Sequence, residues 1–203
     1  MPLQPQLPTV RAEPLWDEWQ SWLRAKYPKG DVPLMVIEWS PIYCQAILAH
    51  DAGARELAAI GCRSAVESIG YVFRYWRPDG SNGWFRQERL TRSGKPERWE
   101  YSLVAESLKE AGALTPTIVL ALDHIKFDGD AAAHISKRSY EEFDLSRAGK
   151  PRRPGSPTDP DQVWMTWEDV LRDLKETVEV FKTVVLAAEA ERERTRATAE
   201  TSG

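Results

Sequence analysis

The chain has 203 residues, of which 42% are apolar and 29% are charged, and its formal net charge is -4. Such a chain is long enough to bury one substantial core, and its negative charge disfavours a protein that wraps DNA through its global charge. Cys44 and Cys62 form no Cys-x-x-Cys pair, so we expect two free thiols in a reducing, cytoplasmic environment.

The N-terminal residues lack the basic start and the apolar run of a secretory signal. An unbroken apolar stretch such as Ile118 to Leu122 is far shorter than the ~20 residues that cross a bilayer. We therefore expect a protein that does not insert into membranes. The prolines within residues 1–14 predict an extended N-terminal arm.

Residues 15–145 are expected to form one α+β core domain, which begins with a short amphipathic helix. Apolar side chains recur every three or four positions over residues 15–23, which is the spacing of one helix face. The apolar run 34–37 then predicts a buried strand. Ser40 followed by Pro41 predicts the N-cap and the first turn of a second helix.

The next segments predict helix first and then strands. The alanine-rich residues 45–59 favour helix by propensity, interrupted at Gly53 and ended at Gly61. Over residues 68–104, β-branched and aromatic side chains are punctuated by turn-forming segments, which predicts three strands in an antiparallel meander. Residues 106–112 predict a short helix closed by a glycine.

The run 117–122 is apolar throughout and predicts an additional, central strand. The expected fold is thus an α+β antiparallel β-meander with this additional strand, packed with short helices, plus a long C-terminal amphipathic helix. Residues 146–162 are rich in proline and glycine and predict a linker. The amphipathic helix is expected over residues 163–195, and a disordered tail over 196–203.

The expected meander, residues 71–101, interleaves arginines with aromatic side chains. Rings on a sheet can stack on exposed bases while guanidinium groups contact phosphates, so this pattern predicts binding of single-stranded nucleic acid. The alternative is that period-two alternation buries the rings as core and leaves the arginines on a solvated face. The candidate residues are Arg74, Trp76, Arg77, Trp84, Arg86, Arg89, Arg98 and Trp99.

A second candidate site follows the run 117–122 and consists of Asp123, His124, Asp130 and His134. Carboxylates and imidazoles at a strand end can hold a divalent cation, which suggests a metal-dependent nuclease or hydrolase. Turn-forming acids and solvated histidines are the alternative. The chain has no Walker or dinucleotide phosphate loop and no Gly-x-Ser-x-Gly elbow, so no cofactor and no serine nucleophile is indicated.

The C-terminal helix carries one continuous apolar stripe, and Thr166 with Asp169 predicts a capping box at its start. Such a stripe must be buried, either on the chain's own domain or on a partner helix. The linker before the helix favours a partner, which would be a second copy or another protein. The candidate partner-helix face is Trp167, Leu171, Leu174, Val178, Phe181 and Val185.

Nine tryptophans in 203 residues is a high count, which fits interface hot spots as well as core packing. Without a convincing catalytic constellation, the sequence favours a non-enzymatic binding protein, such as a regulator, an adaptor or a phage-type inhibitor. This protein would self-associate through its C-terminal helix. The alternatives are a nucleic-acid-binding module that uses residues 71–101 and a metal-dependent enzyme centred on Asp123 and His124.

Overall fold

The structure is a computed structural model that describes residues 7–30, 32–78, 84–133 and 165–201. Its elements are α1 (Glu13–Lys26), α2 (Leu34–Asp51), α3 (Arg55–Tyr75), β1 (Trp76–Pro78), β2 (Trp84–Arg86), α4 (Ser102–Glu110), α5 (Pro116–Ala133) and α7 (Trp167–Thr201). The predicted α+β fold with a meander and a central strand is wrong. Within the described ranges the chain is mostly helical, and its sheet consists of β1 and β2 paired antiparallel.

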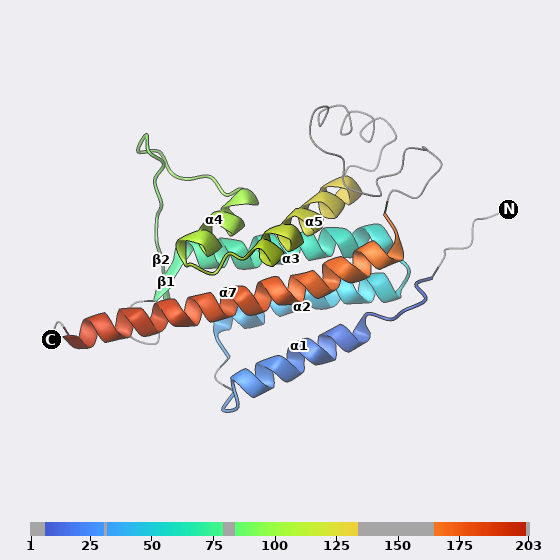
Figure 1. Cartoon of the computed structure of the whole chain (residues 1–203), viewed down its shortest axis with the longest axis horizontal. Coiled ribbons are helices and arrows are strands. Elements are labelled where there is room, and N and C mark those ends of the chain that lie inside the picture. Colours follow the sequence, from blue (N-terminus) through green and yellow to red (C-terminus); the bar gives the residue numbers. More distant parts are fainter. Residues whose placement is uncertain (1–6, 31, 79–83, 134–164, 202–203) are drawn as a thin grey trace.

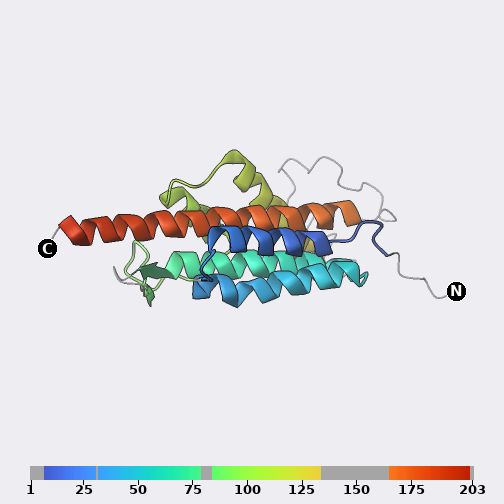
Figure 2. The same cartoon turned by 90° about the horizontal axis from the view of Figure 1, so that it is seen from below.

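Helix α7 runs along most of the length of the molecule and packs against α1, α2, α3 and α5 (Figure 1, Figure 2). Helices α2 and α3 form a hairpin that turns at Gly53, whose φ of 81° favours glycine. Helix α1 covers α2 and α7 on one side, whereas α4 and α5 cover α3 on the other (Figure 1). The hydrophobic core lies between these helices.

Aromatic side chains join α1, α2 and α7 at the centre of this core. The ring of Phe181 lies edge-on to Trp19, Trp39 and Tyr43, with centroid separations of 5.6, 5.0 and 5.7 Å. The Tyr43 hydroxyl donates a hydrogen bond of 3.1 Å to the carbonyl of Leu174. Trp19 and Trp39 are therefore core residues in this protein, which is the commoner role of a buried tryptophan.

The start of α7 confirms the predicted capping box. The Asp169 amide donates to Thr166 Oγ1 at 3.1 Å, and the Thr166 amide and hydroxyl donate to Asp169 Oδ2 at 3.0 and 2.9 Å. The helix continues to Thr201, into the segment that was expected to be a tail. The predicted linker, residues 146–162, lies outside the described residues.

The predicted strand at 34–37 is wrong, because these residues form the first turn of α2. Helix α2 is apolar on nearly all sides and lies between α1, α3 and α7, so its sequence does not show the alternation of an amphipathic helix. Pro41 lies inside the helix rather than at its start. Ser40 is no N-cap either, since its hydroxyl donates to the Val36 carbonyl at 2.8 Å, as a residue inside a helix does.

Gly61 was expected to end a helix, but it lies inside α3. A Cβ atom at this position would lie 2.7 Å from the Cβ of Ala46 on α2. The glycine therefore lets α2 and α3 approach closely instead of ending a helix.

The predicted three-stranded meander over 68–104 is also wrong, because residues 68–75 complete α3. Aromatic residues favour strands by propensity, but here they are spaced like residues on one face of a helix. Tyr71 and Tyr75 are four residues apart, and their rings contact each other with centroids 4.9 Å apart. In the described residues that follow the short pair of β1 and β2, Leu90 and Pro96 form an isolated bridge.

The run 117–122 is helical as well, because it lies in α5. Ile118, Leu122 and Ile125 are buried, whereas Val119 and Leu120 are exposed, which is the spacing of one helix face. The predicted short helix at 106–112 is confirmed by α4, which is followed by Gly112 with a φ of 72°. In the described part of the chain, no helix has the length and apolar character needed to cross a bilayer.

Candidate functional site

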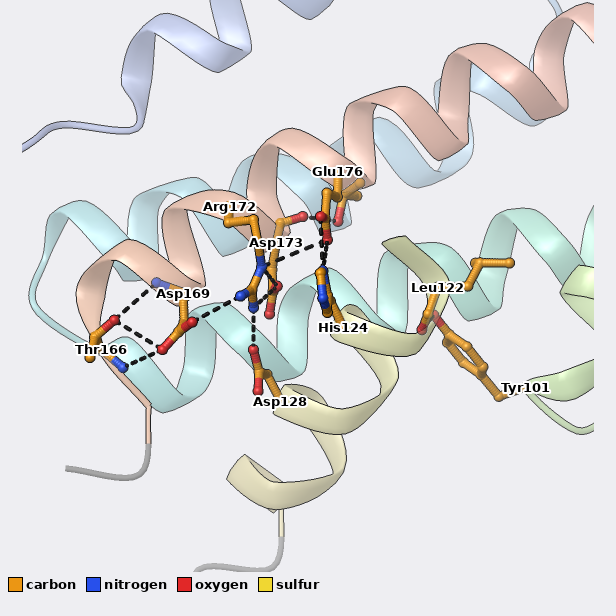
Figure 3. A network of polar contacts seen from close by, with 10 residues as sticks. Tyr101, Leu122, His124, Asp128, Thr166, Asp169, Arg172, Asp173 and Glu176 are labelled. Carbon is orange, nitrogen blue, oxygen red and sulfur yellow. Dashed lines mark hydrogen bonds and ion pairs between the residues drawn. The ribbon is translucent and has the colours of Figure 1, made fainter. Parts of the chain in front are cut away.

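A network of charged side chains joins α5 to α7 (Figure 3). Helix α5 contributes His124 and Asp128, which are four residues apart and thus lie on one helix face. Arg172 on α7 binds the Asp128 carboxylate from Nη2 at 2.6 Å and the Asp173 carboxylate from the same nitrogen at 2.7 Å. Its other terminal nitrogen donates to Asp169 at 2.9 Å. One guanidinium group therefore links three carboxyl groups.

Two of these carboxyl groups are buried. The side chains of Asp128 and Asp173 are 2% and 0% exposed, and no described side chain or backbone group donates a hydrogen bond to Asp173 Oδ2. Burial, followed by the negative charge of Asp128, raises the pKa of Asp173 to about 8, although Arg172 opposes the shift. A carboxyl group with such a raised pKa can hold a proton at neutral pH.

His124 is held by a carboxylate of the facing helix. Its Nδ1 lies 2.9 and 3.1 Å from the two carboxylate oxygens of Glu176 (Figure 3). The histidine side chain is 18% exposed, and Arg172 Nε lies 3.8 Å from Glu176. This arrangement orients the imidazole ring and links it to the same network.

The residues of the predicted metal site lie in different surroundings. Asp123 is exposed on α5, whereas Asp130 pairs with Arg63 at 2.5 Å and with Lys126. His134 lies outside the described residues. Among the residues that are described, no group of three or more His, Cys, Asp or Glu side chains could hold a metal ion.

A second charged cluster fixes the segment that follows β2. Arg74 on α3 is 4% exposed and donates to both carboxylate oxygens of Glu97, with distances of 3.0 and 2.8 Å. Its Nη1 donates to Glu110 on α4 at 2.9 Å. Hydrogen bonding to Arg74 lowers the pKa of Glu97. We call residues 87–99 the anchored loop, because this buried guanidinium ties its C-terminal part to α3.

Backbone hydrogen bonds fix the outer part of the anchored loop. The Glu97 amide donates to the Arg89 carbonyl at 2.8 Å, and the Thr91 amide donates to the Lys95 carbonyl at 2.7 Å. At the base, Trp99 packs over Gly70, where a Cβ atom would lie 3.1 Å from the indole ring. The loop projects from the end of the bundle between β2 and α4 (Figure 1).

The anchored loop exposes apolar and basic side chains. Leu90 is 60% exposed, and Phe85 on β2 is 50% exposed. Four basic residues in and beside the loop are also exposed, namely Arg86, Arg92, Lys95 and Arg98. The loop and its flank therefore present both apolar and cationic side chains to solvent.

Much of the predicted nucleic-acid surface is used in contacts within the chain. Arg77 pairs with Glu191 at 3.3 Å, and Arg89 pairs with Glu110 at 3.0 Å. Trp76 and Trp99 are half-buried, and Trp99 packs against Tyr71 and Tyr75. Trp84 belongs to β2, and its side chain is not described. Of the eight candidates, Arg86 and Arg98 are the exposed ones among those described, whereas Arg74 is buried.

A cavity of about 440 Å³ lies at the base of the anchored loop, between α3, α4 and α7. Its charged lining residues are Arg77, Arg89, Glu110, Glu191 and Arg194. Since Arg77 pairs with Glu191 and Arg89 with Glu110, most of this charge is neutralised within the wall. The first pair connects β1 to the C-terminal half of α7, and the second connects the anchored loop to α4.

The predicted partner-helix face lies mostly inside the molecule. Leu174, Val178, Phe181 and Val185 are buried in the core, and Trp167 and Leu171 are partly buried. A partner helix could contact this stripe only after α7 had left the core.

Sequence reasoning missed Arg172, Asp173 and Glu176 as parts of one site. The spacing of Asp169, Arg172 and Glu176 on one helix face was a usable signal for a charged network. Its partner Asp128 lies 44 residues from Arg172 in the chain, so only the packing of α5 on α7 reveals the pair. Comparison of this chain with protein-family models, with curated proteins and with solved structures gives no match.

Proposed function

We propose that this chain is a non-enzymatic binding protein that recognises an acidic surface of a partner protein through its anchored loop. The observation that carries the proposal is a fixed loop backbone with an exposed apolar side chain, Leu90, on it. A loop that is already ordered loses little conformational entropy on binding, which is a large part of the cost of recognition by flexible segments.

The charge of the loop supports an acidic partner. Residues 86–98 contain five basic side chains, Arg86, Arg89, Arg92, Lys95 and Arg98, against two carboxylates, Glu88 and Glu97. The whole chain has a net charge of -4, so this segment departs from the rest in sign. A local positive charge speeds association with an acidic surface and disfavours basic partners.

The apolar part of the loop favours a protein over a nucleic acid. Stacking on bases uses exposed flat rings, and the two described tryptophans of the predicted nucleic-acid surface, Trp76 and Trp99, are half-buried. Phe85 on β2 is an exposed ring beside the loop. Leu90 offers an aliphatic side chain, which fits an apolar recess of a protein better than the face of a base.

Site-specific photocrosslinking tests the proposal. Because Cys44 and Cys62 are free thiols, which suits a reducing cytoplasm, the experiment belongs in intact cells of the source organism. A photoreactive residue replaces Leu90, which is 60% exposed, or Leu57, which is 62% exposed at the opposite end of α3. We expect a crosslinked protein, identified by mass spectrometry, from position 90 and not from position 57.

The double change Arg92→Glu with Lys95→Glu should reduce this crosslink at least tenfold, because both cations are exposed and neither supports the core. Equal crosslinking from both positions, or no effect of the charge reversal, contradicts the proposal. A crosslinked product that disappears on nuclease treatment would instead support the nucleic-acid alternative.

A further inference from the structure

We propose that Asp128 and Asp173 form a buried proton-binding site between α5 and α7, in which the two carboxyl groups share one proton beside Arg172. This inference is independent of the binding function proposed above. It concerns the contact between α5 and α7 beside the N-terminal half of α3, where a Cβ atom at Gly129 of α5 would lie 2.6 Å from the Cβ of Arg63. None of its residues belongs to the anchored loop (Figure 3).

The first argument is the closeness of two buried carboxyl groups. Asp128 and Asp173 are 2% and 0% exposed, and both bind the same Nη2 atom of Arg172. Two ionised carboxylates held this close together and out of water repel each other, which is unfavourable. A proton on one carboxyl group removes this repulsion and leaves the other carboxylate beside the Arg172 guanidinium.

The second argument is an oxygen atom without a donor. Asp173 Oδ2 receives no hydrogen bond from any described side chain or backbone group. If the pair holds a proton, a carboxyl O–H of one group can donate to the other carboxylate, since both groups lie within 2.7 Å of the same Nη2 atom of Arg172. A shared proton thus satisfies an atom that would otherwise be both charged and without a partner.

The other titratable groups that the structure describes around the pair have partners of their own or contact with water. On α3, Cys62 is buried and burial raises the pKa of its thiol, while Arg63 pairs with Glu67 and Asp130. On α7, Asp169 and Glu176 are 31% and 22% exposed, so water stabilises their charges. Further neighbours among the described residues are His124 and Lys126, which pair with Glu176 and Asp130, and Tyr101, whose hydroxyl donates to the Leu122 carbonyl.

The proton links folding to pH. An aspartic acid in the unfolded chain loses its proton near pH 4, whereas Asp173 has a pKa of about 8 in the folded protein. Between these values the folded state binds one proton more than the unfolded state, so stability is highest at the acidic end and is lost as the pH rises to about 8. The unfolding equilibrium constant should rise about tenfold per pH unit over this window.

The test compares urea unfolding of the full chain with that of Asp173→Asn, between pH 6 and 9. Asparagine resembles the protonated acid but has no proton to lose, so the variant should lack the pH dependence that this pair adds to wild type. We expect the ratio of the two unfolding constants to change about tenfold per pH unit up to pH 8 and then level off. Asp169→Asn, at a partner of the same arginine that is 31% exposed, serves as control and should keep the wild-type slope.

Proton release gives a second readout. Urea unfolding of the wild-type chain at pH 7 in weak buffer should release about one proton more than unfolding of Asp173→Asn. If Asp173→Asn does not fold, infrared spectroscopy of the native wild-type protein tests the proposal instead, through the C=O band of a protonated carboxyl group. This band should be present at pH 7 and lost at pH 9. Parallel pH profiles with equal proton release, or no protonated carboxyl band at pH 7, would overturn the proposal.

Discussion

At the scale of single residues, Arg74 was expected on a nucleic-acid-binding surface, but it is buried and binds two carboxylates of the same chain. The guanidinium group is 4% exposed and donates to Glu97, to Ser107 and to Glu110, so its charge and its donors are matched by neighbours. A buried cation is tolerated when it is paired and hydrogen-bonded in this way. Arg74 therefore stabilises the anchored loop instead of binding a phosphate.

Glu97→Gln should loosen the anchored loop without unfolding the protein. The change removes the charge from a two-fold pair with Arg74, which is worth about 1.5–3 kcal/mol for charged partners. We expect hydrogen exchange of the Thr91, Lys95 and Glu97 amides, which are all bonded within the loop, to become roughly 10- to 100-fold faster at pH 7. Glu88→Gln, at an exposed carboxylate of the same loop, is the control. Equal exchange in both variants would refute the role of Arg74 as an anchor.

At the scale of elements, the helices that were predicted correctly are those with one apolar face and a clear end signal. Helix α1 has apolar residues on one face, α4 ends before Gly112, and α7 begins with the capping box of Thr166 and Asp169. The failures at 34–37, 68–75 and 117–122 concern helices that contact neighbours on more than one side. A short apolar run looks the same in a helix and in a strand, and the exposure of Val119 and Leu120 is visible only in the folded structure.

Gly61→Ala should destabilise the protein, although alanine usually stabilises a helix by up to about 1 kcal/mol relative to glycine. The added Cβ atom would lie 2.7 Å from the Cβ of Ala46 and 3.1 Å from its Cα, and neither atom can move without shifting α2. We expect a loss of roughly 1–3 kcal/mol in the free energy of unfolding, measured by urea titration. Ser64→Ala on the same helix should change it by less than about 0.5 kcal/mol. An increase in stability for Gly61→Ala would show that α2 and α3 do not cross this closely.

At the scale of the whole molecule, α7 is a core element and not an attachment. Its stripe fills the space between α1, α2, α3 and α5, and the stripe was expected to bind a partner chain because a proline-rich segment precedes it. The deciding observation is burial, since Phe181 and Leu174 are fully enclosed by other helices of the same chain. Self-association through this face would therefore compete with folding.

A chain that stops before Met165 should fail to melt cooperatively. Each buried side chain of α7 contributes roughly 1.5–3 kcal/mol through burial, and their sum is comparable to the ~5–15 kcal/mol that stabilises a typical domain. The buried residues removed include Val170, Leu174, Val178, Val180, Phe181, Val184 and Val185. The control ends after Glu193, which retains all of them, and should melt within a few degrees of the full chain. A cooperative melt of the shorter chain, together with its monomeric mass by light scattering, would show that α7 is an assembly element.

The sequence by itself determined the local features of this protein. These are the first and last helices, the break at Gly53, the capping box and the basic character of the segment after β2, because each depends on residues within one or two turns of one another. Only the tertiary structure decided whether the apolar runs were helix or strand, and which charges were buried. The pairs of Arg74 with Glu97 and of Arg172 with Asp128 join residues that are 23 and 44 positions apart. Such pairs depend on which helix faces meet. The hydrophobic and charge pattern along one segment does not indicate which other segment packs against it.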